Sequence, residues 1–344
     1  MGDYRRMVDA AQNKITGWTP LYEHIVSAKV LEEIAGNKFS GLINGDAGDV
    51  NEYFKQYNHF FEDHGYDAIP FECCITNILP GTHALAGHEP GSIQNMDDFK
   101  KYPWEAIPGI FKEKFYPLFQ AFQDNLPPGM KGVGGPGNGV FEIVQDLTGF
   151  EALCIIKYDD EELFSLLFQR VGETMETIWK DVIRRFGDAY CIMRFGDDLG
   201  YKTSTLLPPD DIRNQCFPAY RKIINLVHGA GKPFALHSCG CIFSVMDGLI
   251  DLGINAKHSN EDQIAPFSQW IDTYGKRIAF FGGIDTDHLC QYDEKQITEL
   301  VTETCAYAST RCGFALGSGN SITDYVPPAS YLAMIRAVRA FRGE

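Results

Sequence analysis

Short apolar segments alternate with longer amphipathic segments along most of the chain. Eight of the apolar segments have the length and composition of buried strands: 20–25, 68–75, 130–135, 190–196, 233–238, 254–259, 278–283 and 313–318. Strands that are apolar on both faces and alternate with helices are typical of parallel sheets. Eight such units predict an α/β fold of the (β/α)8 TIM-barrel type, in which the sheet closes on itself.

The amphipathic segments predict helices with recognisable ends. Apolar residues recur every three or four positions in 161–186, and Asp160 can cap the start of this helix. Residues 49–64 show the same periodicity and are followed by Gly65, a typical helix terminator. The last helix is expected to open at Pro327, because proline is favoured in a first helical turn.

No internal repeat, low-complexity tract or linker divides the chain, which favours a single domain over residues 1–344. The residues before the first strand predict an N-terminal helical extension. Residues 76–129 are rich in Pro and Gly and predict a long insertion after the second strand. We expect this insertion to lie over one end of the barrel.

Composition bears mainly on partners and compartment. The chain has 46 acidic and 30 basic residues, and its net charge of −16 disfavours nucleic acid or an anionic membrane surface as a partner. No apolar run approaches the roughly 18–20 residues of a spanning helix, and the start lacks the apolar stretch of a signal peptide. Ten cysteines without the regular spacing of a disulfide framework fit a reducing compartment. We therefore expect a cytoplasmic protein, and the pattern leaves open whether it forms a homodimer.

A histidine and a cysteine stand two residues apart at the end of the fifth predicted strand. Because side chains alternate along a strand, His237 and Cys239 should point the same way, with Ser238 opposed. Barrel active sites lie at the carboxyl ends of the strands. An imidazole and a thiolate placed there are typical zinc ligands. A packed histidine beside a core thiol is the alternative, which the spacing alone does not exclude.

A catalytic zinc ion needs a third protein ligand and one open position. Candidates follow the sixth predicted strand, where the chain carries His258, Glu261 and Asp262. Glu261 is the preferred ligand, although Glu261 and Asp262 could instead be the solvated start of a helix. Cys312 precedes the eighth strand at the opposite end of the barrel and is expected in the core.

Three further residues near strand ends are candidates for positioning a substrate or exchanging its protons. Asp198 follows the fourth strand beside Asp197, Tyr201 comes three residues later, and Glu23 lies in the first strand segment. The alternatives are a solvent-facing aspartate and ordinary rim polarity at Glu23. The glycine-rich segment 132–140 lacks the helix-opening fingerprint and the lysine of phosphate-binding loops, which argues against nucleotide binding.

Three stretches, in this order, resemble the uroporphyrinogen decarboxylase superfamily: GDDLGYKTSTLLPPDDIRNQCFPAYRKIINLVHGAGKPFALHSCG (196–240), FFGGIDTDHL (280–289) and GFALGSGNSITDYVPPASYLAMIRAVRAF (313–341). In the decarboxylases of this superfamily, an arginine-rich segment after the first strand holds the porphyrin carboxylates. The corresponding place in this chain reads LYEHIVSAK (21–29). The resemblance therefore favours the other branch, the corrinoid-dependent methyltransferases such as coenzyme M methyltransferases and O-demethylase components.

That branch carries a His-x-Cys pair and a distant cysteine as zinc ligands. His237 and Cys239 match the pair, but Asn320 stands where the distant cysteine would be. The resemblance implies a zinc-dependent enzyme that moves a methyl group between a small methylated substrate, of methyl ether or thiol type, and the cobalt of a corrinoid (cobalamin). A separate corrinoid protein would carry that cofactor. The missing cysteine favours a substrate other than a thiol.

Two other functions are compatible with the sequence. One is a metal-free tetrapyrrole decarboxylase of the same fold, against which the missing arginines count. The other is a non-catalytic barrel that binds a corrinoid or another small ligand, suggested by the lost third cysteine. Metal content separates the first hypothesis from both.

Overall fold

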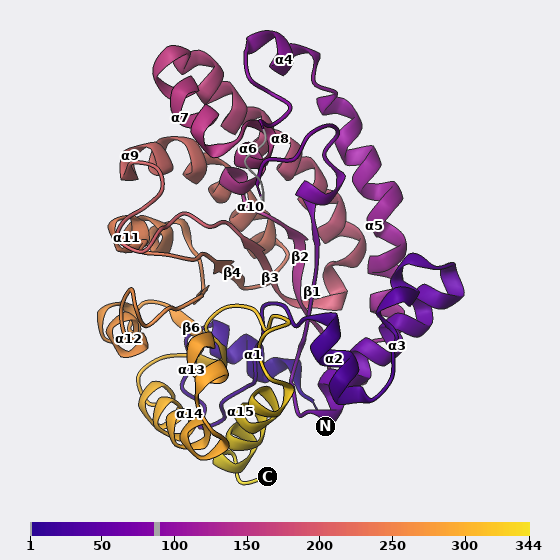
Figure 1. Cartoon of the computed structure of the whole chain (residues 1–344), viewed down its shortest axis with the longest axis vertical. Helices are drawn as coiled ribbons and strands as arrows, with labels where there is room; N and C mark the ends of the chain where they lie inside the picture. The colour runs from indigo at the N-terminus through magenta and orange to yellow at the C-terminus, as the bar shows by residue number, and fades with distance from the viewer. Residues whose placement is uncertain (1, 86–89) are drawn as a thin grey trace.

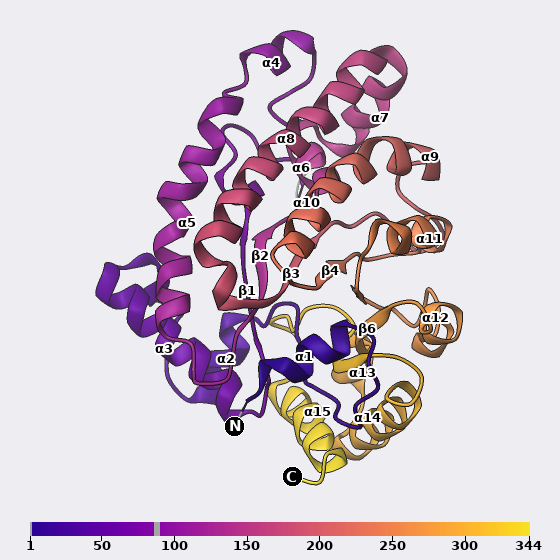
Figure 2. The ribbon, with the colours of Figure 1, turned by 180° about the vertical axis from the view of Figure 1, so that it is seen from behind.

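Seven parallel strands form the centre of the computed structural model, which describes residues 2–85 and 90–344 (Figures 1 and 2). They pair in chain order, each parallel to the next. The strands are β1 (Ile69–Cys74), β2 (Gly132–Gly137), β3 (Tyr190–Gly196), β4 (Phe234–His237), β5 (Ala256–His258), β6 (Ala279–Ile284) and β7 (Phe314–Ser318). Each overlaps one predicted segment, so seven of the eight predicted strands and the α/β class are confirmed.

The first predicted strand, 20–25, does not join the sheet as a full strand. It meets β7 in an isolated parallel bridge between Leu21 and Leu316, and a second bridge follows at its end. The ladder is interrupted because the backbone N–H of Ser318 donates to the side-chain carboxylate of Glu23, at 3.2 Å. Within the described residues the sheet therefore has seven strands instead of the eight predicted, curled as in a TIM-like barrel.

Helices form a curved layer outside the sheet (Figures 1 and 2). The longer ones are α3 (Ala47–Asp63), α5 (Ile107–Asp124), α8 (Glu161–Phe186), α10 (Phe217–Gly229), α14 (Glu294–Ala308) and α15 (Pro328–Phe341). Shorter ones are α2 (Ala28–Ala35), α4 (Met96–Lys101), α6 (Val140–Thr148), α7 (Phe150–Asp159), α9 (Pro209–Asp211), α11 (Phe243–Leu252), α12 (Phe267–Tyr274) and α13 (Thr286–Gln291). The predicted helix 161–186 is confirmed, and Asp160 caps it by accepting a hydrogen bond from the N–H of Leu163.

Helix α1 (Tyr4–Ala11) lies across the amino-terminal end of the strands, where Figure 2 shows it in front of the sheet. Its buried residues join an apolar cluster inside the sheet, which we call the floor. The floor consists of Met7, Ala10, Ala11, Tyr22, Ala68, Val133, Cys191, Ile192, Ala235, Ala256, Ala279, Phe281 and Ala315. Three of its alanines are register partners on β4, β5 and β6. The small side chains leave room for α1 to close this end.

The segment 76–129 contains α4 and α5, and residues 86–89 within it lie outside the described residues. Helix α5 packs against α3 and α8 as part of the outer layer. The expectation that the rest of the segment covers a barrel end stays a prediction.

Two predictions from composition can be compared with the structure. All ten cysteines are free, and Cys312 is buried as expected. Among the described residues, no helix combines the length and the apolar character required to cross a membrane.

Candidate metal site at the barrel mouth

Strand register brings two histidines together at the carboxyl end of the sheet. His237 ends β4 and His258 ends β5, and the two are direct register partners. Each follows a floor alanine by two positions, Ala235 on β4 and Ala256 on β5, so each faces the same side of its strand as that alanine. The inward-facing side chains of both strands therefore change from apolar alanine to polar histidine within two residues.

His237 also meets a thiol and a carboxylate. Its Nε2 lies 3.4 Å from the Sγ of Cys239 and 3.6 Å from an Oδ1 of Asp198. The three donor atoms lie within 4.8 Å of one another, so they could share a metal ion. A tetrahedral zinc ion separates its nitrogen and sulfur ligands by about 3.5 Å. The pair predicted from the sequence is thus brought together, and its donor spacing fits zinc.

Two glycines allow the loops after β3 and β4 to touch. A Cβ on Gly240 would lie 2.1 Å from the backbone of Gly200, and Gly240 has a φ of +82°. This close approach places Asp198 beside Cys239, whose backbone N–H donates to the Asp198 carboxylate at 2.9 Å. Ser238, on the opposite side as predicted, accepts a hydrogen bond from the N–H of Leu199.

The sulfur of Cys239 accepts hydrogen bonds from two neutral donors. The amide of Asn320 donates at 3.3 Å, and the hydroxyl of Ser259 donates at 3.5 Å. Asn320, which stands in place of the third cysteine of the resembling enzymes, is therefore next to the site. Burial raises the pKa of the Cys239 thiol to about 12. A bound dication would reverse this effect, because a coordinated thiol loses its proton.

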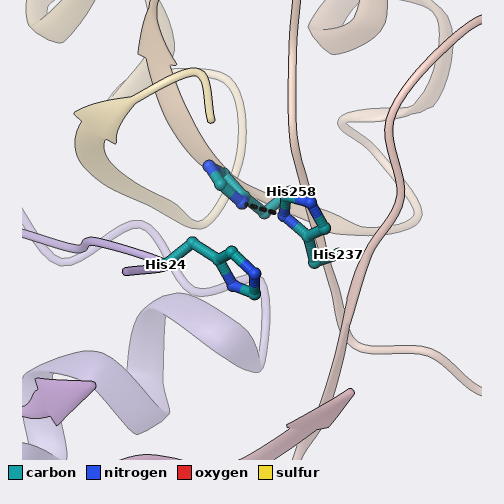
Figure 3. Close-up of side chains that lie close together, drawn as sticks. All are labelled: His24, His237 and His258. Carbon is teal, nitrogen blue, oxygen red and sulfur yellow. Dashed lines mark hydrogen bonds between the residues drawn. The ribbon is translucent and has the colours of Figure 1, made fainter. Parts of the chain in front are cut away.

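A third histidine completes a second possible metal-binding group, shown in Figure 3: His24, His237 and His258. His24 stacks on His237 with ring centroids 3.8 Å apart and planes only 8° from parallel. The nitrogen lone pairs of imidazole lie in the ring plane, so one ion cannot lie on a lone pair from each of two stacked rings. The group of His237, Cys239 and Asp198 is therefore the better metal site.

Burial makes all three imidazoles neutral. It lowers the pKa of His24 and His237 well below the usual value, and it lowers that of His258 to about 3. The nearby guanidinium of Arg194 lowers each pKa further. Neutral imidazole is the form that binds metal ions.

Asp197 and Asp198 have different environments. Asp197 is buried, and its carboxylate accepts hydrogen bonds from the N–H groups of Phe141 and Glu142 at the start of α6 and from the hydroxyl of Tyr220. Burial raises the pKa of Asp197 to about 7. Asp197 thus holds α6 against the strand end, whereas the partly exposed Asp198 faces His237.

The other predicted site residues lie at different depths. Glu23 is buried, accepts hydrogen bonds from the N–H and hydroxyl of Ser318, and has its pKa raised to about 8 by burial. Glu261 belongs to neither possible metal-binding group of the described residues. Tyr201 is 61% exposed on the loop after β3. Their roles as catalytic residues and, for Glu261, as a ligand stay predictions.

The sequence predicts a substrate-positioning role for Asp198 but does not place it among the expected metal ligands. The usable signal was the pair of glycines, Gly200 and Gly240, each two residues or fewer from a polar candidate. The sequence predicts His258 only as a candidate third ligand. His258 follows Ala256 by two residues, as His237 follows Ala235 in β4. This shared spacing indicates that His258 faces His237.

Comparison with known proteins supports the fold and the family. A methyltransferase from Methanosarcina mazei is 14% identical with a TM-score of 0.72, and the match covers 98% of each chain. A B12-independent methionine synthase from Shewanella sp. W3-18-1, in complex with selenomethionine, is 11% identical with a TM-score of 0.51, covering 86% of this chain and 88% of that one. At these identities the likeness concerns the fold alone. No curated protein matches in sequence. The model of the uroporphyrinogen decarboxylase (URO-D) family matches residues 125–341, more than half of the chain, and the protein therefore belongs to this family.

Proposed function

We propose that the protein is a zinc-dependent methyltransferase. In this proposal His237, Cys239 and Asp198 hold the ion, and a methyl group moves between a small methylated substrate and the cobalt of a corrinoid on a separate protein. The convergence of three suitable donor atoms at the barrel mouth carries the proposal. The methyltransferase of the same fold supports it.

In this proposal Asp198 is the third ligand in place of Glu261, the ligand expected from the sequence. Its carboxylate is already held beside Cys239 by the backbone N–H of that residue. One thiolate and one carboxylate would balance the two charges of zinc, as two thiolates do in the resembling enzymes. A neutral site is easier to bury than a charged one.

The donor set favours an oxygen-linked methyl group. Cys239 would be the single thiolate, and Asn320 and Ser259 donate hydrogen bonds to its sulfur, which withdraws electron density from it. When bound, zinc would act as a Lewis acid on the atom that releases the methyl group, and cobalt(I) of the partner would supply the nucleophile. We propose a methyl ether as the substrate class, with a methylated thiol as the alternative.

The remaining candidates would orient the substrate. Tyr201, 61% exposed on the loop after β3, would do so at the rim, whereas Asp198, as a metal ligand in this proposal, no longer has the separate positioning role expected from the sequence. The buried Glu23 would act through Ser318, the last residue of β7, whose N–H and hydroxyl donate hydrogen bonds to it. The charge of −16 and the free thiols are in keeping with the proposed small-molecule and protein partners in the cytoplasm.

The test combines metal analysis with a methyl-transfer assay. We expect about one zinc per chain in fresh protein and methylation of cob(I)alamin by one or more of a panel of methoxylated and methylthio compounds. His237→Ala and Cys239→Ala should lose both the zinc and the transfer, whereas Cys290→Ala, at an exposed thiol, should keep both.

Two matched variants identify the third ligand. Asp198→Asn should release zinc, and Glu261→Gln should retain it; the reverse result would restore Glu261 as the ligand. Zinc-free wild-type protein that still binds a corrinoid would contradict the proposal and favour the non-catalytic barrel. Turnover of uroporphyrinogen would favour the decarboxylase.

A further inference from the structure

The geometry points to His258 as a positioning residue that accepts a hydrogen bond from the Nδ1–H of His237 and so leaves Nε2 of His237 for the metal. This inference rests on the proposed zinc site. It concerns the hydrogen bond between the two Nδ1 atoms, 2.8 Å long, drawn as a dashed line in Figure 3.

The proton positions follow from one fixed acceptor. Nε2 of His258 lies 3.0 Å from the backbone carbonyl oxygen of Ser318, which can only accept, so this nitrogen carries the proton. In a neutral ring the other nitrogen, Nδ1, is then an acceptor. His237 must donate to it from its own Nδ1, because one of two nitrogens 2.8 Å apart must carry a proton.

The free nitrogen of His237 is therefore Nε2. This is the atom that lies 3.4 Å from Sγ of Cys239 and 3.6 Å from Asp198. Metal-binding histidines almost always donate their second ring N–H to an acceptor that fixes the tautomer and the ring orientation. Here a second imidazole provides that acceptor.

The acceptor itself is anchored. Ser318 donates both its N–H and its hydroxyl to the buried carboxyl group of Glu23, which holds the carbonyl that accepts a hydrogen bond from the Nε2–H of His258. Register pairing of β4 with β5 fixes the two rings side by side. A Cβ on Gly282 would lie 3.0 Å from the His258 ring, so this glycine leaves the space that the ring occupies.

His24 has a different relation to His237. It stacks on the ring, and its buried Nδ1 has no hydrogen-bond partner among the described residues. It therefore contacts His237 without fixing its proton. Substitution of His24 separates the effect of packing from the effect of the hydrogen bond.

The experiment compares two near-isosteric variants of His258 in the full chain. His258→Asn places an oxygen acceptor where Nδ1 was, whereas His258→Gln can reach Ser318 in place of Nε2 but offers no acceptor to His237. Zinc affinity is measured by competition with a chelator, and the cobalt(II)-thiolate absorption band reports whether Cys239 still binds. We expect His258→Gln to bind zinc 10–100-fold more weakly than wild type and His258→Asn to stay within a few-fold.

Controls separate the possible failures. His59→Phe, on the exposed face of α3, should bind zinc like wild type. If wild type binds zinc through Cys239 but His258→Gln binds equally tightly, the inference is wrong and the proposed function stands. If His24→Phe loses zinc and Cys239→Ser does not, the three histidines are the metal site and the inference is wrong. If wild type binds no zinc, the proposed function and the inference fail together.

Discussion

The floor and the mouth of the barrel are built on the same strands but differ in the polarity of their side chains. On β4 and β5 the floor residues are Ala235 and Ala256, and two positions further the mouth residues are His237 and His258. The floor is apolar and closed by α1. The mouth holds carboxyl, imidazole and thiol groups with pKa values shifted by burial.

This difference in polarity indicates that the floor contributes mainly to stability and the mouth mainly to the proposed function. Apolar burial stabilises the fold by about 25 cal/mol per Å² removed from water, whereas buried ionisable groups cost free energy unless they are paired. In the proposed function the mouth carries the chemistry, and its buried ionisable groups cost stability that the apolar floor and the apolar contacts of the outer helices offset. Variants in each region should change different observables.

The largest expected effect lies in the floor. Met7 is fully buried under the strands, and Met7→Ala should lower the free energy of unfolding by about 2–5 kcal/mol. Urea denaturation of metal-free protein measures this change, with the exposed Ile15→Ala as a control expected within about 0.5 kcal/mol. Zinc affinity of folded Met7→Ala should equal that of wild type. A weaker affinity would show that floor and mouth are coupled.

The helix 161–186 and seven strands could be predicted because their signals are local. Apolar residues on both faces indicate buried strands, and the period of 161–186 together with Asp160 defines α8. The segment 20–25 has the same apolar character, yet its Glu23 takes the N–H of Ser318 that a strand would bind through its backbone. The local pattern of apolar residues does not reveal that a side chain takes the place of the backbone as the acceptor.

The site was only partly predictable for a related reason. The spacing of His237 and Cys239 is a property of one strand and was readable. The meeting of His237 with His258 depends on register between strands, and that of Cys239 with Asp198 depends on contact between two loops. Such contacts are set by tertiary packing rather than by the sequence near each residue.

The next effect concerns the pH dependence of the mouth. Burial raises the pKa of Glu23 from 4.5 to about 8, so the folded protein binds this proton more tightly than the unfolded chain does. The stabilising contribution of protonated Glu23 is fully present below pH 4.5 and is lost as the pH rises to about 8. Each unit of pKa difference contributes roughly 1.4 kcal/mol, which gives a few kcal/mol as an upper limit.

Glu23→Gln tests this contribution because glutamine keeps a hydrogen-bonding group without the charge. The free energy of unfolding of metal-free protein should fall less steeply between pH 5 and pH 8 in Glu23→Gln than in wild type. Met7→Ala, in the floor, should leave the wild-type slope unchanged. Equal slopes in Glu23→Gln and wild type would show that the Glu23 carboxyl is already ionised in the folded protein at pH 5.

The smallest effect on stability tests the loop contact that shapes the mouth. Gly240 and Gly231 both have positive φ, +82° and +73°, but only Gly240 has a neighbour where a Cβ would stand. Alanine at either position should cost on the order of 1 kcal/mol in backbone strain, and at Gly240 it must also displace Gly200. We therefore expect Gly231→Ala to keep wild-type zinc affinity and Gly240→Ala to lose it, because the displacement separates Asp198 from Cys239. Equal zinc affinities in the two variants would mean that the contact between the loops does not set the distance between the ligands.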